Sequence, residues 1–279
     1  SDLLPDESNV FRAPFNPGPL ATDEAFTNYT NKDGINYVLG NINADNISGK
    51  TMNIWPSMYQ VIRKCNYILS RKHEAKMTTV QDEEVTGYTH MLRGYAYYNL
   101  IPNNEQPEAY NRARSTYDEC VDYCCEELEK AAKYLPRDIA SSYFGRPSRG
   151  AAFALIARLR LQQASPLYNG GNAARITYGD WKRSVDGVNY ISQTYDERRW
   201  AVAAAACKRV IDMNKYKLHT VSIDPMQPVR PLPSNVPDAN FPDGAGGIDC
   251  YRSYSEMFNG ETIGSKNTEF IWGRSFGDL

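Results

Sequence analysis

Residues Gly145 to Gly171 read GRPSRGAAFALIARLRLQQASPLYNGG, and this stretch decides the fold class of the 279-residue chain. Its apolar side chains recur at helical spacing, at Ala151, Ala152, Leu155, Ile156, Leu159 and Ala164. Pro147 suits a first helical turn, and Pro166, Gly170 and Gly171 end the helix. Because small side chains let helix axes approach closely, we expect this helix to pack on both flanks.

The same periodicity predicts further helices on both sides of that stretch. One face is formed by Trp55, Tyr59, Ile62, Asn66 and Leu69. A helix from about Val80 to Leu100 opens with a capping-box spacing, Thr79 to Asp82. Ser115 and Asp118 have the same spacing before a face made of Tyr117, Val121, Cys124, Leu128, Ala131 and Leu135. Another helix is predicted for Trp200–Met213.

These helices pair naturally as antiparallel hairpins, with Gly150–Ala164 beside Trp200–Met213. The small residues and the closing Pro136 are similar to a tetratricopeptide repeat, although no full 34-residue consensus is present. We therefore predict a mainly α fold of tetratricopeptide-like antiparallel helical hairpins, an α-α superhelix with long irregular loops. Residues 1–279 are expected to form one helical domain with loop-rich insertions at about 165–198 and 218–250.

The composition of the chain argues against several classes of function. The formal net charge is −2, so the chain lacks the basic excess that nucleic-acid binding needs. The apolar runs AAFALIA and WAVAAAAC are too short to span a bilayer. The six cysteines show no CxxC spacing, the three histidines are scattered, and no nucleotide or cofactor motif occurs. We predict no metal and no cofactor.

Four segments together resemble the SusD/RagB family of outer-membrane glycan-binding lipoproteins. They are the SPLYNGG loop, the W…Y…I…N helix from Trp55, the LRGYAYYNL helix and the NTEFIWG segment. The resemblance implies a SusD-like helical fold over the family's N-terminal half and non-catalytic capture of an oligosaccharide or glycan. It also implies a lipid anchor at the outer-membrane surface and a SusC-like TonB-dependent transporter as partner.

Sugar-binding side chains are expected in the loops, because aromatic faces pack on C–H surfaces and polar groups bond hydroxyls. The candidate ligand-binding residues are Asn43, Asp45, Asn46, Tyr178, Trp181, Tyr251 and Tyr254. We interpret Trp55 as a core residue and Arg93 as the partner of a carboxylate or a helix end.

Two other functions remain open at this point. A helical-repeat module that binds a protein or peptide is the main alternative. A helical glycoside hydrolase ranks third, because Asp180, Asp186, Asp196 and Glu197 lie in one loop-rich region. We favour a binding protein over an enzyme, since no catalytic motif is present.

Overall fold

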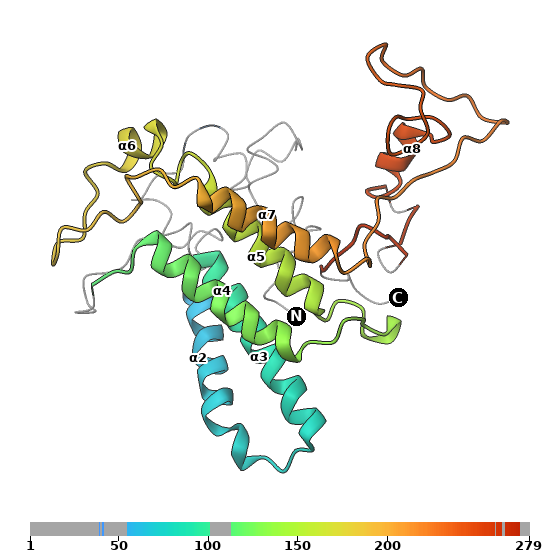
Figure 1. The fold of residues 1–279 in the computed structure, drawn as a ribbon. Coiled ribbons are helices and arrows are strands. Elements are labelled where there is room, and N and C mark those ends of the chain that lie inside the picture. The colour runs from blue at the N-terminus through green and yellow to red at the C-terminus, as the bar shows by residue number, and fades with distance from the viewer. Residues whose placement is uncertain are drawn as a thin grey trace.

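The chain forms helices joined by long loops, as Figure 1 shows for the computed structural model. The structure describes residues 39, 41, 55–100, 113–259, 261–263 and 266–273. In chain order the elements are α2 (Trp55–Arg71), the 3-10 turn η3 (Lys72–Glu74), α3 (Thr79–Leu100), α4 (Tyr117–Tyr134), the 3-10 turn η4 (Ser141–Tyr143), α5 (Arg149–Ala164), α6 (Asn172–Tyr178), α7 (Arg198–Ile211) and α8 (Cys250–Ser255). Extended pairing in this part of the chain is limited to isolated bridges.

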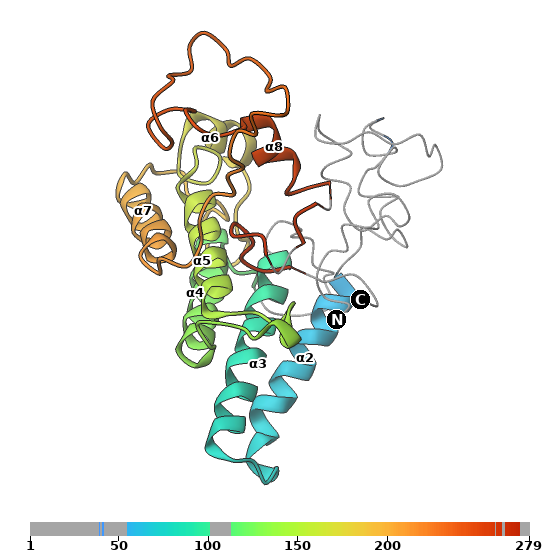
Figure 2. The ribbon, with the colours of Figure 1, turned by 90° about the vertical axis from the view of Figure 1, so that its right-hand side faces the viewer.

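Each long helix packs against the next one along the chain. Helix α2 lies against α3, α3 against α4, α4 against α5, and α5 against α7. Figure 1 shows α2 and α3 as one hairpin, and Figure 2 shows the helices following one another from α2 across to α7. The mainly α, tetratricopeptide-like fold class is therefore confirmed.

Helix α4 buries the face that its spacing predicts. Its six apolar positions, Tyr117 through Leu135, are each at most 3% exposed. Gly94 of α3 faces this helix so closely that an added Cβ would lie 3.0 Å from the Leu128 side chain. Helix α5 adds Ala152, Ile156 and Leu159 to the same core. The small-residue stripe of α5 thus packs as expected.

The prediction of which face of α2 is buried is wrong. In the structure the helix is rotated about its axis relative to that prediction, so a different set of side chains faces α3. Met58, Val61, Ile62 and Cys65 are buried, whereas Tyr59 is 43% exposed. The buried set packs on Ala96 and Leu100 of α3, and this contact decides the orientation of α2. Of the predicted face, Ile62 alone is buried among the described side chains; the side chain of Trp55 lies outside them.

Both predicted capping boxes are displaced by one residue. Helix α4 has its box at Thr116 and Glu119, where each side chain accepts a hydrogen bond from the other residue's backbone N–H. Ahead of α3, Thr78 and Gln81 exchange equivalent bonds. Asp82 instead accepts hydrogen bonds from the Lys72 ammonium, at 2.7 and 2.9 Å. Asp82, which the spacing had assigned to a helix cap, therefore forms an ion pair with Lys72 instead.

A buried carboxylate ties α4 to α3. Glu127 is 0% exposed, and its Oε2 accepts a hydrogen bond from Arg93 Nε at 2.7 Å. His90 Nδ1 lies 2.9 Å from the same oxygen, and Lys130 donates to Oε1 at 3.1 Å. Arg93 also donates to Asn66 of α2 at 2.7 Å. The prediction that Arg93 pairs with a carboxylate is confirmed, and the pair links three helices.

We predict that Glu127→Ala lowers the free energy of unfolding by about 3 kcal/mol or more, because it leaves Arg93 without its buried partner. Urea denaturation measures this loss. Glu126→Ala is the control, since that exposed neighbour on the same helix should change stability by less than about 0.5 kcal/mol. Equal effects of the two substitutions would contradict a special role for Glu127.

The Glu127 network also predicts an acid dependence of stability. Burial raises the pKa of this carboxyl, but hydrogen bonds from His90, Arg93 and Lys130 outweigh burial and lower the pKa to about 2. A carboxyl with a lowered folded-state pKa stabilises the fold above its unfolded pKa of about 4.3. This stabilisation should fade as the pH falls toward 2, and the fading should be absent in Glu127→Ala.

Candidate functional site

The SPLYNGG loop leads from the end of α5 into α6, and hydrogen bonds tie it to the segment just before α7. Asn169 is 0% exposed, and its amide donates to the backbone oxygen of Asp196 at 2.9 Å while accepting from the Asp196 N–H at 3.0 Å. Gly170 has a φ of +63°, and an added Cβ would lie 2.2 Å from the carbonyl carbon of Thr194. The asparagine and the glycine therefore close the base of the 165–198 insertion.

A row of aromatic rings stands on that base and is named here the ring cluster. Tyr168 stacks on Tyr117 at 4.4 Å between ring centres and lies 6.4 Å from Tyr178. Trp181 continues the row, 6.0 Å from Tyr178 and 4.9 Å from Tyr190. The structure thus brings the predicted ligand residues Tyr178 and Trp181 together.

Neighbouring groups already cover much of these two rings. The Arg114 guanidinium carbon lies 4.5 Å from the Trp181 ring centre and 5.2 Å from that of Tyr190. Trp181 keeps 36% of its surface exposed, and Tyr178 is half-buried. Most of the ring cluster contributes to packing of the insertion, while the edge at Trp181 stays open to solvent.

Helix α8 carries the other predicted pair, and it faces its polar side inward. Asp249, Ser253 and Glu256 are 6%, 8% and 9% exposed. Asp249 caps the helix by accepting from the Arg252 N–H at 2.9 Å, and Ser253 Oγ accepts from the Val221 N–H at 2.9 Å. Polar bonds, with little apolar packing, therefore hold α8 on the loop beneath it.

Glu256 is the strongest of these anchors. Its carboxylate accepts from Arg252 Nε at 3.0 Å and lies 3.3 Å from His219 Nε2. Burial raises the pKa of Glu256, but the hydrogen bonds from His219 and Arg252 outweigh burial and leave the pKa below its ordinary value. Glu256 is therefore ionised at neutral pH and holds the Arg252 and His219 side chains in place.

The outward side of α8 is aromatic. Tyr251, Tyr254 and Phe258 are 53%, 68% and 73% exposed. The Tyr254 and Phe258 ring centres are 5.1 Å apart. These three residues form what we name the aromatic strip. Such a distribution reverses the usual burial of aromatic residues, and exposed apolar patches of this kind mark interaction sites.

Arg230 borders the aromatic strip. Its guanidinium carbon lies 4.1 Å from the Tyr251 ring centre. Arg230 makes no ion pair with any residue that the structure describes. A stacked guanidinium keeps donors at its edge, so it can bond hydroxyl or carbonyl oxygens of a ligand lying on the strip.

The predicted site residues thus fall into separate groups. Asn43, Asp45 and Asn46 lie outside the described residues. Figure 1 places α6, next to Trp181, and α8, with Tyr251 and Tyr254, at opposite ends of the α5–α7 pair. Sequence reasoning missed Phe258 and Arg230. The spacing of Tyr251, Tyr254 and Phe258 was visible in the sequence, whereas the approach of Arg230 depends on the folding of a long loop.

Two acidic residues of the insertion, Asp186 and Asp196, have pKa shifts opposite to the one that a glycosidase's general acid needs. Hydrogen bonds from Arg183 lower the pKa of Asp186, and hydrogen bonds from Arg198 lower that of Asp196. A general acid needs a raised pKa instead. Among the described residues no group of three or more His, Cys, Asp or Glu side chains is placed to hold a metal. None of the described helices is both long and apolar enough to cross a membrane.

Comparison with known proteins identifies the class. Residues 6–161 match the model of a SusD-like family described as starch-binding and associating with the outer membrane. This match spans more than half of the chain, so the chain belongs to that family and the resemblance seen in the sequence is confirmed. No curated protein matches the chain.

Two solved structures of BT4246 support the same fold. A structure of BT4246 is 24% identical, covers 98% of this chain and 49% of its own, and has a TM-score of 0.67. The selenomethionine form of BT4246 is 24% identical, covers 93% and 46%, and has a TM-score of 0.64. A SusD-like protein from Bacteroides fragilis NCTC 9343, BF3747, is 21% identical and covers 61% and 29%, with a TM-score of 0.43. The chain spans about half the length of the BT4246 structures.

We predict that Gly170→Ala destabilises the chain more than Gly187→Ala does. Both glycines have a positive φ, but an added Cβ at Gly187 meets nothing within 4 Å. Gly187→Ala should cost about 1 kcal/mol from backbone strain alone. Gly170→Ala adds a clash with Thr194 and should cost at least about 2 kcal/mol. Equal urea midpoints for the two variants would contradict this account of the loop.

A second prediction concerns the anchoring of α8. Glu256→Ala should raise the hydrogen exchange rate of α8 amides by about tenfold or more, because it removes a carboxylate that holds Arg252 and His219. Amides of α3, α4 and α5 should keep their protection. Glu261→Ala, at an exposed position, is the control. Uniform loss of protection across all helices would contradict a local role for Glu256.

Proposed function

We propose that this chain binds a glycan without altering it chemically, with the aromatic strip on α8 as the main contact surface. The observation that carries the proposal is the reversed burial of α8, whose polar residues are buried and whose aromatic residues are exposed. Exposed rings lose the free energy that burial would give, and a ligand packed on them restores it.

The chemistry of the strip suits a sugar. Pyranose rings present patches of C–H groups that pack on aromatic faces, and their hydroxyls need donors and acceptors at the rim. Tyr251 and Tyr254 supply both a ring and a hydroxyl, and Arg230 adds guanidinium donors beside Tyr251. Three neighbouring rings are longer than one sugar unit, so the strip favours consecutive units of a chain.

A purely binding role fits the acidic group nearest the strip. Glycoside hydrolysis needs one carboxyl with a raised pKa and a second carboxylate across the scissile bond. Glu256 is turned inward, is bonded to Arg252 and His219, and has a lowered pKa. It is thus unsuited to act as a general acid toward a ligand on the outer face of α8.

We extend the proposal to the cellular location and the partner of this chain, on the basis of the family description. Its members are described as associating with the outer membrane. We propose that this chain acts there at the cell surface, held by a lipid anchor, and passes its glycan to a SusC-like TonB-dependent transporter. We also propose secondary contacts to the glycan from Tyr178, Trp181 and the residues Asn43, Asp45 and Asn46.

One observation favours a second candidate function, the binding of a protein or peptide. Helix α7 exposes Trp200 and Ile211 on one side, at 40% and 71%, and Val202 on another side, at 49%. Beside Val202 a groove of about 760 Å³ runs between α7, α5 and α4. A groove between helices, with apolar side chains such as Val202 in its wall, is a common docking geometry for a partner helix. Its lining contains no aromatic ring that could pack on the C–H face of a sugar, so it is less suited to a glycan.

The glycan proposal predicts that Tyr254→Ala and Phe258→Ala each weaken binding to a retained polysaccharide by about tenfold, which corresponds to about 1.4 kcal/mol per lost ring. Affinity electrophoresis of the chain through gels containing starch or other neutral polysaccharides measures this. Tyr195→Ala is the matched control, because Tyr195 is 54% exposed but lies in the other loop region.

The outcomes separate the candidate functions. Unchanged retention in both strip variants would place the contact elsewhere. An absence of retention by every polysaccharide, combined with capture of a peptide that Val202→Asp abolishes, would favour the α7 groove. Release of reducing sugar during the experiment would contradict the non-catalytic role.

A further inference from the structure

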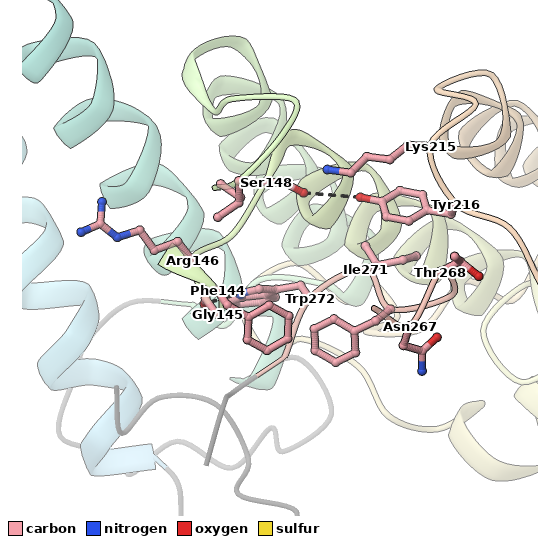
Figure 3. Close-up of a pocket in the computed structure, with 12 residues that line it drawn as sticks. Phe144, Gly145, Arg146, Ser148, Lys215, Tyr216, Asn267, Thr268, Ile271 and Trp272 are labelled. Atoms are coloured by element: carbon pink, nitrogen blue, oxygen red, sulfur yellow. Dashed lines mark hydrogen bonds between the residues drawn. The ribbon is translucent and has the colours of Figure 1, made fainter. Parts of the chain in front are cut away.

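A small pocket lies at the base of the loop that carries α8, and it is distinct from the aromatic strip. Its walls come from the segment before α5, the residues just after α7 and the segment 267–272, as Figure 3 shows. The volume is about 180 Å³. We name it the basal pocket.

The aromatic wall of the basal pocket is fixed by contacts among its own residues and by one contact with Tyr95 outside it. Trp272 Nε1 donates to the Gly145 carbonyl oxygen at 3.0 Å. The Trp272 ring meets the Tyr95 ring edge to face, with centres 5.3 Å apart. Phe144 and Phe270 stack at 5.3 Å. Because each ring is held by another group, the pocket is formed before any ligand enters.

The polar wall consists of two hydroxyls with bonding capacity left. Ser148 is 3% exposed, and among the described residues its hydroxyl has one hydrogen-bonding partner, the Tyr216 hydroxyl at 3.4 Å, a long distance for two oxygens. Gly150 makes room for this arrangement, since an added Cβ would lie 2.0 Å from the Tyr216 hydroxyl oxygen. The lack of a side chain at residue 150 therefore keeps the tyrosine hydroxyl beside Ser148.

Charge in the basal pocket is compensated. The Lys215 ammonium donates to the Arg137 carbonyl oxygen at 2.7 Å and pairs with Asp138 at 3.1 Å. Arg146 extends away from the other lining residues in Figure 3, and its guanidinium carbon lies 4.1 Å from the Tyr143 ring centre. With the nearby cations engaged elsewhere, the pocket is suited to an uncharged ligand.

Size restricts that ligand to one ring. At about 30 Å³ per liquid water, the pocket volume corresponds to about six waters, well below the roughly 300–1,000 Å³ of sites for drug-sized ligands. An aromatic wall opposite two hydroxyls is complementary to a ring with one C–H face and several hydroxyl groups. We infer that the basal pocket binds a single neutral pyranose unit. This unit is either the terminal residue of a glycan chain or a simple monosaccharide glycoside.

This inference takes its ligand class from the proposed function, but it concerns a second site with its own residues. The aromatic strip is open and suits internal units of a chain, whereas the recessed basal pocket has room for one terminal unit. Two such sites would let the chain recognise both the presence of a polysaccharide and its free end.

Saturation-transfer NMR and tryptophan fluorescence with methyl α-glucopyranoside, methyl α-mannopyranoside and methyl β-galactopyranoside test the basal pocket. At least one of these probes should bind saturably to the native chain. The double variant Ser148→Ala with Tyr216→Phe keeps the pocket's shape but removes its hydroxyls, and it should bind that probe about tenfold more weakly. Tyr143→Phe removes a hydroxyl outside the pocket and is the control. Circular dichroism verifies that each variant is folded.

Every outcome has a consequence. No saturable binding of any of the three probes, or equal binding by the folded double variant, would overturn the pocket inference. Stronger binding of methyl glucuronide than of the neutral probes would overturn its assignment to an uncharged sugar. Probe binding that survives Tyr254→Ala but is lost in the double variant would support two separate sites. Polysaccharide retention without probe binding would overturn the basal pocket and leave the strip intact.

Discussion

The carboxylate of Glu127 is the constraint on which the helical scaffold depends. It is fully buried in α4, and a charge in that position is tolerable only with partners. Arg93 and His90 come from α3, and Arg93 reaches on to Asn66 of α2. Because α4 also packs against α5, which in turn packs against α7, the orientation fixed at Glu127 is passed to the whole row of helices.

Both loop regions are attached to that row by polar contacts at specific points. Arg199 at the start of α7 donates to Asp118 of α4 at 2.8 Å and to the Tyr168 carbonyl at 3.2 Å. At the other end, Lys217 and Thr268 exchange backbone and side-chain bonds, which close the base of the loop that carries α8. Candidate binding residues are therefore held on a rigid scaffold although they lie in loops.

The sequence predicted those features that depend on residues close together in the chain. It did not predict features that depend on contacts between distant segments. The buried face of α4 was predicted correctly, since six apolar positions at helical spacing leave one orientation. The face of α2 was not, because Met58 and Cys65 compete with Tyr59 and packing on Ala96 settles the choice. The candidate site follows the same rule. Tyr251 and Tyr254 were proposed from their aromatic chemistry and are exposed in the structure, whereas Arg230 meets Tyr251 only after the intervening loop has folded.

Different residues anchor α8 and form its exposed aromatic surface, so the two sets can be substituted independently of each other. Asp249, Ser253 and Glu256 hold the helix through hydrogen bonds, so Tyr251, Tyr254 and Phe258 contribute little to its stability. A substitution in the helical core is constrained by close packing, as the 3.0 Å approach of Gly94 to Leu128 illustrates. No comparable packing constrains the exposed rings. The side chains of the strip can therefore vary while the fold that carries them stays the same.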